Sequence, residues 1–179
     1  MKNLIVFLTL ITFSFTLSLS FAGEETRGKI LILYYSKTGK TKLACEALKK
    51  TLGADILEIK FVKDKIEPEH PDLSPYAFII LGSPIWAGKL STPIRILIDK
   101  NRFDGKKVVI FTTANTFAKE YVEKSKPLVT AVGGKVVGYY LVLSKEKINN
   151  EFVDRTDAQI VEDTLKFIPE IKKGFSPLP

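Results

Sequence analysis

The sequence contains one cysteine and one histidine among its 179 residues. With a single cysteine, Cys45, no disulfide can form within the chain. His70 has no patterned partner, so the sequence predicts neither a metal site nor a histidine-based catalytic dyad. Cys45 falls within a helical pattern with no histidine near it in sequence, and we interpret it as a small core residue and not as a nucleophile. No catalytic side chain is therefore expected.

Ionisable side chains are almost absent from the first 22 residues. Lys2 precedes the apolar run LIVFLTLITFSFTLSLS, and Ser20-Phe21-Ala22 places small residues where a signal peptidase reads the chain. We interpret residues 1–22 as a signal peptide, which predicts an exported protein, periplasmic or extracellular. The alternative is a membrane anchor formed by residues 4–22, whose length approaches the roughly 20 residues of a membrane span. Residues 23–179 are predicted to form one domain.

Basic residues outnumber acidic residues by 27 to 20, for a net charge of +7. A surplus of this size occurs in proteins that bind nucleic acids or anionic surfaces. Here the lysines are scattered along the chain, which is typical of solvated helix faces. We therefore expect no nucleic-acid partner and no contact with a membrane except through the N-terminal segment, and we leave acidic redox partners open.

Apolar runs alternate with amphipathic segments along the rest of the chain. We expect strands at 29–35, 55–61, 76–81, 107–113 and 136–143, and helices at 41–52, 92–101, 119–132 and 156–173. Residues 62–75 are charged and contain three prolines, so they are predicted to form a loop. This alternation predicts an α/β fold of three layers with a doubly wound, five-stranded parallel sheet. In such sheets, ligands bind beyond the carboxyl ends of the strands, where the strand order reverses.

The loop after the first strand reads SKTGKT, residues 36–41. It leads directly into a helix, whose first N–H groups and positive end suit an anion, and hydroxyl groups in the loop add donors. The segment therefore predicts a phosphate site, with an ordinary polar turn as the alternative. A nucleotide-binding P-loop is not expected, because its first glycine would fall on Tyr34 and no later strand ends in an aspartate for magnesium.

Two motifs carry a resemblance to a known family. Residues 36–41 match the [ST]-x-T-G-x-[ST] pattern of flavodoxins, and GSPIWAG at 82–88 is similar to the G-x-P-I-W-[WA]-G segment that follows the third strand in flavodoxin-like proteins. The resemblance runs from Lys29 to about Ile171. It implies FMN as the cofactor and a sheet of strand order 2-1-3-4-5. It also implies the short-chain type, without the segment that splits the fifth strand of long-chain flavodoxins.

The resemblance also implies which residues contact the cofactor. Trp86, the only tryptophan, is expected to stack on the flavin ring, with a hydrophobic plug over the sheet edge as the alternative. Gly82 and its small neighbours would let the backbone approach the ring closely. The third loop, 112–118, departs from the family in having no glycine. The expected contacts are Ser36, Lys37, Thr38, Gly39, Lys40, Thr41, Ser83, Pro84, Ile85, Trp86, Ala87, Gly88, Thr112, Thr113, Ala114, Asn115 and Phe117.

Three functions follow from the resemblance. The first is an FMN-binding redox protein that transfers electrons to a partner protein or to a small acceptor such as a quinone. The second is an NAD(P)H-dependent quinone or flavin reductase, and the third is a flavin-free envelope binding module. Flavodoxins that carry electrons are typically acidic, whereas this chain is basic. No twin-arginine pair precedes the apolar run, so an exported chain would cross unfolded and acquire FMN outside the cytoplasm.

Overall fold

A computed structural model describes residues 28–116 and 123–176. The segment interpreted as a signal peptide, residues 1–22, lies outside the described residues. Within these two ranges, no helix has both the length and the apolar character needed to cross a membrane.

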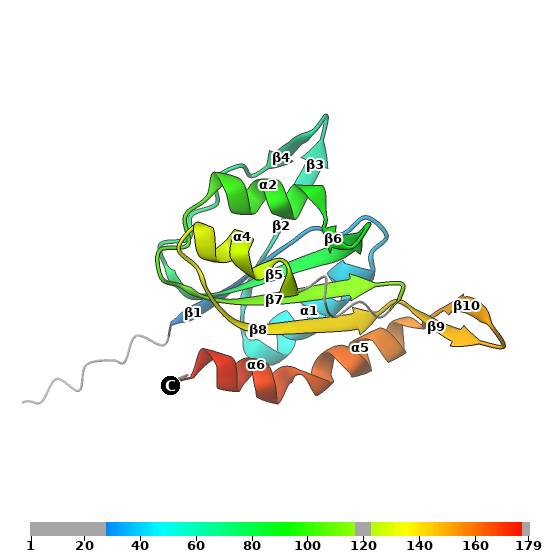
Figure 1. The fold of residues 1–179 in the computed structure, drawn as a ribbon. Coiled ribbons are helices and arrows are strands. Elements are labelled where there is room, and N and C mark those ends of the chain that lie inside the picture. Colours follow the sequence, from blue (N-terminus) through cyan, green and yellow to red (C-terminus); the bar gives the residue numbers. More distant parts are fainter. Residues whose placement is uncertain (1–27, 117–122, 177–179) are drawn as a thin grey trace, which may run out of the picture.

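The described chain forms one central sheet with helices on both faces, and two small hairpins (Figure 1). The strands are β1 (Lys29–Tyr34), β2 (Asp55–Glu58), β3 (Lys60–Val62), β4 (Lys65–Glu67), β5 (Tyr76–Trp86), β6 (Lys89–Leu90), β7 (Lys107–Ala114), β8 (Lys135–Leu143), β9 (Lys145–Ile148) and β10 (Glu151–Asp154). The helices are α1 (Lys40–Leu52), α2 (Thr92–Lys100), α4 (Lys126–Ala131), α5 (Asp157–Lys166) and α6 (Ile168–Phe175).

The central sheet confirms the predicted topology. Five parallel strands lie in the order β2-β1-β5-β7-β8, which is the expected order 2-1-3-4-5. The two-residue strand β6 pairs antiparallel with the end of β5. Strand β8 runs for nine residues without interruption, and the β9–β10 hairpin follows it. The strand order reverses between β1 and β5, so this is where a ligand site is expected.

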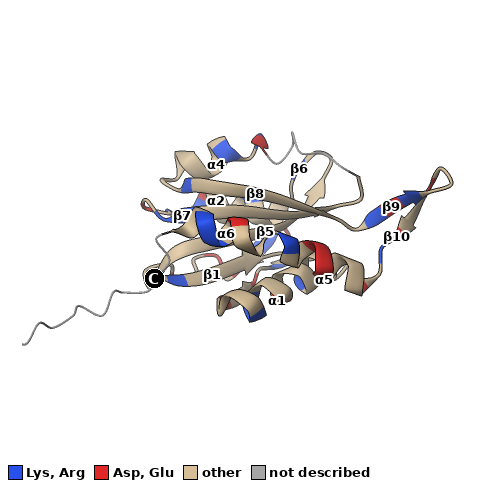
Figure 2. Cartoon of the chain, turned by 90° about the horizontal axis from the view of Figure 1, so that it is seen from below, with Lys and Arg blue, Asp and Glu red and all other residues tan. Residues whose placement is uncertain are grey.

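Alternating side chains of the strands supply two separate cores. Ile30, Ile32 and Tyr34 of β1 belong to a buried cluster that includes residues of α1, α5 and α6. Leu31 and Leu33 belong to a second cluster that includes residues of α2 and α4. Because successive side chains of a strand point to opposite faces, an uninterrupted apolar run feeds both clusters. Figure 2 shows the sheet from below, with α1, α5 and α6 on the near side.

Two hairpins were not predicted from the sequence. The expected strand 55–61 ends at Glu58, because Ile59 enters the core and the chain then turns into β3. The expected loop 62–75 contains β4, which pairs with β3 across a turn in which Lys63 and Asp64 have positive φ. The β9–β10 hairpin projects beyond the sheet in Figure 1.

Two of the predicted helices differ in length from the observed ones. The expected helix 156–173 is divided at Phe167 into α5 and α6, because Pro169 has no N–H group for the helical hydrogen bond. Within the expected helix 119–132, residues 119–122 lie outside the described residues. The part that the structure describes becomes regularly helical at Lys126, with Pro127 in its first turn.

Candidate functional site

The carboxyl ends of β1, β5 and β7 lie side by side. Tyr34 is opposite Gly82 in the β1–β5 pairing, and Ser83 is opposite Thr112 in the β5–β7 pairing. The Tyr35 N–H donates to the Gly82 carbonyl over 3.0 Å, so pairing continues one residue past β1. The three loops predicted to form the site therefore start from one edge of the sheet, at the point where the strand order reverses.

The first loop leads into α1 through a glycine. Gly39 is the N-cap residue of α1, has a φ of 88°, and carries no side chain that could cap the helix. The first N–H groups of any helix have no partner within it, so these donors stay open toward the loop. Ser36 contributes a buried hydroxyl that has no hydrogen-bond partner among the described residues. An unpaired buried donor beside an uncapped helix start is the arrangement that a phosphate completes.

Thr41, the last residue of the motif, connects the first loop to the third. Its Oγ1 atom lies 2.7 Å from Oγ1 of Thr113, and both residues are buried. Either hydroxyl can donate in this pair. If Thr113 donates, the hydroxyl proton of Thr41 is left for an anion in the loop. The contact also fixes the start of α1 against the end of β7.

The sequence predicted a loop at 82–91 with Trp86 at its tip, but Trp86 is the last residue of β5. The β5 strand thus includes the first five residues of that loop, and Ala87 and Gly88, both with positive φ, form its turn into β6. The Tyr35 ring packs edge-on against the Trp86 ring, with centroids 5.5 Å apart and planes at 88°. The amine of Lys37 lies 5.8 Å from the centroid of the Trp86 ring. These contacts join the first loop to the second.

Tyr35 was not among the predicted site residues. The sequence signal for Tyr35 was its position at the end of the first apolar run. The residue that follows β1 must lie at the same edge of the sheet as the loop 36–41. Tyr35 also packs edge-on against Phe61 of β3, with ring centroids 6.4 Å apart. An aromatic row therefore runs from the β3–β4 hairpin to the end of β5.

We expect Trp86→Ala to weaken FMN binding by about 0.5–1.5 kcal/mol, the contribution typical of aromatic stacking. Trp86→Phe keeps an aromatic face and should lose less. Fluorescence titration of each variant with FMN measures the difference. Equal affinity of Trp86→Ala and the unchanged protein would place Trp86 outside the flavin contact and favour its alternative role as a plug against Tyr35.

Several predicted contact residues use their side chains within the protein. The fully buried Ser83 hydroxyl accepts from the Ser91 N–H over 2.9 Å and lies 2.8 Å from the carbonyl of Pro84. The Thr112 hydroxyl donates to the Tyr140 carbonyl over 3.1 Å and is also fully buried. Both side chains hold strand ends in place, and the contacts of Ser83 and Thr112 with the cofactor stay predictions.

Lys40 is likewise turned away from the motif in which it stands. Its amine donates to the Arg155 carbonyl over 3.2 Å and pairs with Asp157 over 3.1 Å. Arg155 and Asp157 flank the residue that caps α5, so the first loop is tied to the start of that helix. These partners are 115 and 117 residues away in the sequence, and no local pattern identifies them.

Gly82 has a role in the core. A Cβ atom at this position would lie 2.5 Å from Sγ of Cys45 and 2.7 Å from Cβ of Tyr34. Cys45 is fully buried in α1, as predicted, and this burial raises the pKa of its thiol. The missing side chain of Gly82 therefore lets α1 pack directly over the junction of β1 and β5.

The remaining predicted residues are divided between core and edge. Ile85 is half-buried, packs against the second core cluster and pairs with Leu90, and Pro84 is opposite Thr113. Asn115 is exposed, and its Oδ1 atom accepts from the hydroxyl of Ser144 over 2.9 Å. Ser144 also donates to the carbonyl of Ala114, which turns that acceptor inward. Phe117 lies outside the described residues.

Acidic, histidine and cysteine side chains do not gather near this edge. Across residues 28–116 and 123–176, no three of them come together in a way that could hold a metal ion. The site therefore consists of hydroxyls, open backbone donors and an aromatic ring.

Comparison with known proteins supports the same family. A family model described as a flavodoxin domain matches residues 31–137. A flavodoxin of Nostoc sp. strain PCC 7120 is 26% identical over 168 residues, which cover 82% of this chain and 97% of that protein. A flavodoxin of Trichodesmium erythraeum is 27% identical over 169 residues, with coverages of 82% and 98%.

Solved structures resemble the chain in the same way. A Lactobacillus acidophilus flavoprotein in complex with FMN matches with 25% identity and a TM-score of 0.57, over 64% of this chain and 93% of that one. Oxidised flavodoxin 2 of Bacillus cereus shares the fold, with 22% identity and a TM-score of 0.57, over 81% of this chain and 98% of that one. The family model spans more than half of the sequence and includes the ends of β1, β5 and β7. The chain belongs to the flavodoxin family.

Proposed function

We propose that this protein binds FMN without a covalent bond and transfers electrons through it. The observation that carries the proposal is the Ser36 hydroxyl, which is buried without a partner in the loop before α1. A buried hydroxyl without a partner costs stability, and a phosphate oxygen at the same place would satisfy it. Membership of the flavodoxin family supports FMN as the phosphate-bearing ligand.

The residues at the site fit this ligand. Ser36, Thr38 and the open N–H groups of α1 would hold the phosphate, with Gly39 allowing its close approach. The ring of Trp86 would stack on the flavin, held in orientation by Tyr35. Bound FMN supplies one- and two-electron chemistry, so the protein needs no acid or base of its own. Its residues would position the ring and tune its reduction potential.

The proposal is tested by loading the purified protein with FMN and separating free flavin by gel filtration. We expect stoichiometric FMN in the protein fraction and a reversible change of its visible absorbance on reduction and reoxidation. Loading with riboflavin under the same conditions is the matched control, because it has the ring but lacks the phosphate. Elution of the protein without either flavin would contradict the proposal.

We further propose a redox protein or a small acceptor such as a quinone as the electron partner. The family supports a partner protein in general, and the net charge of +7 favours an acidic one. NAD(P)H is the alternative donor. Rapid oxidation of NADPH by the loaded protein in the presence of a quinone would identify a reductase, and slow oxidation would identify a carrier.

We also propose that the protein is exported and that residues 1–22 are removed. The support is the sequence alone: a lysine, an apolar run and small residues at Ser20 and Ala22. Mass spectrometry of the protein isolated from its native cell tests this. A mature N-terminus at Gly23 would support export, whereas a chain that retains Met1 in the membrane fraction would favour the anchor.

A further inference from the structure

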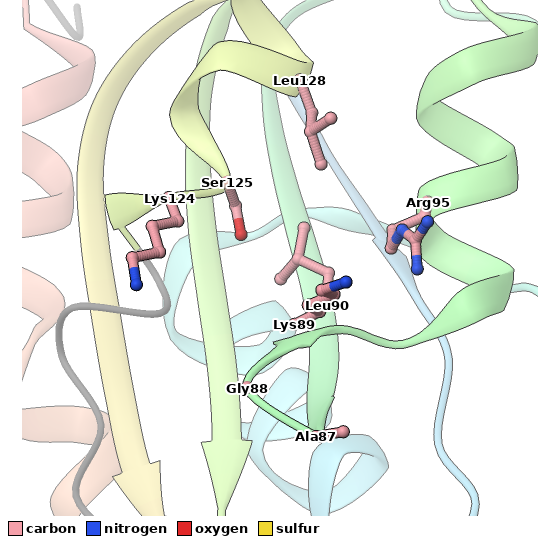
Figure 3. A pocket seen from close by; sticks show the side chains of 8 residues that line it. All are labelled: Ala87, Gly88, Lys89, Leu90, Arg95, Lys124, Ser125 and Leu128. Carbon is pink, nitrogen blue, oxygen red and sulfur yellow. The ribbon is translucent and has the colours of Figure 1, made fainter.

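A hollow adjoins the turn between β5 and β6, on the face of the sheet that α2 and α4 cover. Its volume is about 370 Å³, within the range of small-molecule sites. Figure 3 shows Leu90 and Leu128 pointing toward one another across it. The Leu128 side chain is 43% exposed although it is apolar. The hollow thus has an apolar floor that is open to solvent.

Among the described residues, the charged side chains that line this hollow all have one sign. They are Lys89, Arg95 and Lys124, and no carboxylate of the described chain lines it. Within the described part of the chain, neither Lys89 nor Arg95 forms an ion pair. A guanidinium group binds carboxylate and sulfonate oxygens through paired hydrogen bonds, and an ammonium adds a point charge. The rim is therefore complementary to an anion.

The hollow continues into a groove between α2 and α4. This second space, of about 520 Å³, shares Arg95 and Leu128 with the first and is lined mainly by apolar side chains. Its acidic residue, Asp99, lies one helical turn beyond Arg95 on α2. A negative charge would therefore be favoured at the Lys89 end, and an apolar body would extend from there over Leu128.

We propose that this hollow binds a small amphipathic organic anion. Lys89 and Arg95 would hold its carboxylate or sulfonate group, and Leu90 and Leu128 would contact an aromatic or branched apolar body. The inference goes beyond the proposed function, because the hollow takes a second ligand and uses none of the residues of the loop 36–41. Of the residues that the structure describes, the hollow and the proposed flavin site share only the turn Ala87–Gly88.

The test is calorimetric titration of the full chain loaded with FMN, with naphthalene-2-sulfonate as the probe. The neutral naphthalene-2-sulfonamide, of nearly the same size and shape, is the control. We expect saturable binding of the sulfonate at a single site, about tenfold tighter than binding of the sulfonamide. Arg95→Gln should reduce the affinity for the sulfonate by about tenfold and leave the FMN content unchanged. Lys60→Gln, at an exposed lysine of the β3–β4 hairpin, should change neither quantity.

Three results would overturn the proposal. The first is equal binding of sulfonate and sulfonamide, and the second is unchanged sulfonate affinity in Arg95→Gln. The third is displacement of the sulfonate by FMN, which would make the hollow part of the flavin site. If the chain takes up no FMN, the proposed function fails, but the same titration of the flavin-free chain still decides this inference. Binding that depends on Arg95 then supports the inference, and its absence contradicts it.

Discussion

Ser36→Ala is expected to weaken FMN binding by about 1.5–3 kcal/mol, roughly tenfold to a hundredfold in Kd. The reason is the loss of a hydrogen bond to a charged phosphate oxygen from a donor that has no other partner in the described protein. Riboflavin affinity should stay unchanged, because riboflavin carries no phosphate. The same substitution should stabilise the flavin-free protein by up to roughly 1 kcal/mol, since it removes a buried hydroxyl that is left unsatisfied. Flavin titration and urea unfolding measure the two effects.

Ser83→Ala is the matched control for this prediction. Like Ser36, Ser83 has a buried hydroxyl at the carboxyl edge of the sheet, but this hydroxyl is bonded to Ser91 and Pro84. Its removal deletes these hydrogen bonds, although the Ser91 N–H keeps the Pro84 carbonyl as an acceptor over 3.1 Å, and should destabilise the flavin-free protein by about 0.5–1.5 kcal/mol. The two serines thus have opposite expected effects on unfolding. A Ser36→Ala variant that loses stability and binds FMN normally would remove Ser36 from the phosphate site.

Gly82→Ala is expected to destabilise the protein by about 1–3 kcal/mol, the usual cost of overpacking a core. The new Cβ atom would lie 2.5 Å from Sγ of Cys45 and 2.7 Å from Cβ of Tyr34, so α1 and the end of β1 must move apart. Because α1 carries the loop 36–41 at its start, FMN affinity should fall as well. Urea unfolding gives the first effect, and flavin titration gives the second.

The double variant Cys45→Ala with Gly82→Ala separates the two clashes. Removing Sγ eliminates the closer contact but leaves the contact with Tyr34. The double variant should therefore be less destabilised than the sum of the two single variants, by about 0.5–3 kcal/mol of coupling. Simple additivity would mean that Cys45 does not limit the space at Gly82, and the account of the α1 packing would be wrong.

The parallel sheet could be predicted because its strands are uninterrupted apolar runs. Runs such as Ile30 to Leu33 are apolar on both faces, which occurs in strands covered by helices on both sides. The end of α1 at Gly53 and the start of α2 at Thr92, directly before Pro93, could also be predicted from the residues at these positions. Such signals depend only on neighbouring residues.

The hairpins and the division of the last helix depended on weaker signals. Lys63 and Asp64 take positive φ without the glycine that usually marks such a turn, so β3–β4 had no readable signature. Asn149 and Asn150 also have positive φ, and a pair of asparagines was a signal for the β9–β10 turn. Pro169 marked the point where α6 must begin separately from α5.

The site was predictable in its location and less so in its contacts. Strand ends of a parallel sheet meet at one edge, so the predicted loops 36–41, 82–91 and 112–118 could be grouped in advance. Which side chains are already bonded within the protein depends on distant partners, such as Tyr140 for Thr112 and Asp157 for Lys40. These pairings are tertiary, and a single sequence does not contain them.

A fluorescence titration of the purified protein with FMN and, separately, with riboflavin tests the phosphate site most directly. We predict quenching of FMN fluorescence with a Kd at micromolar levels or below, and much weaker binding of riboflavin. That difference would assign the loop 36–41 to the phosphate. Equal affinity for the two flavins would contradict the phosphate site. No binding of either would mean that this flavodoxin fold functions without a flavin, as the binding-module alternative requires.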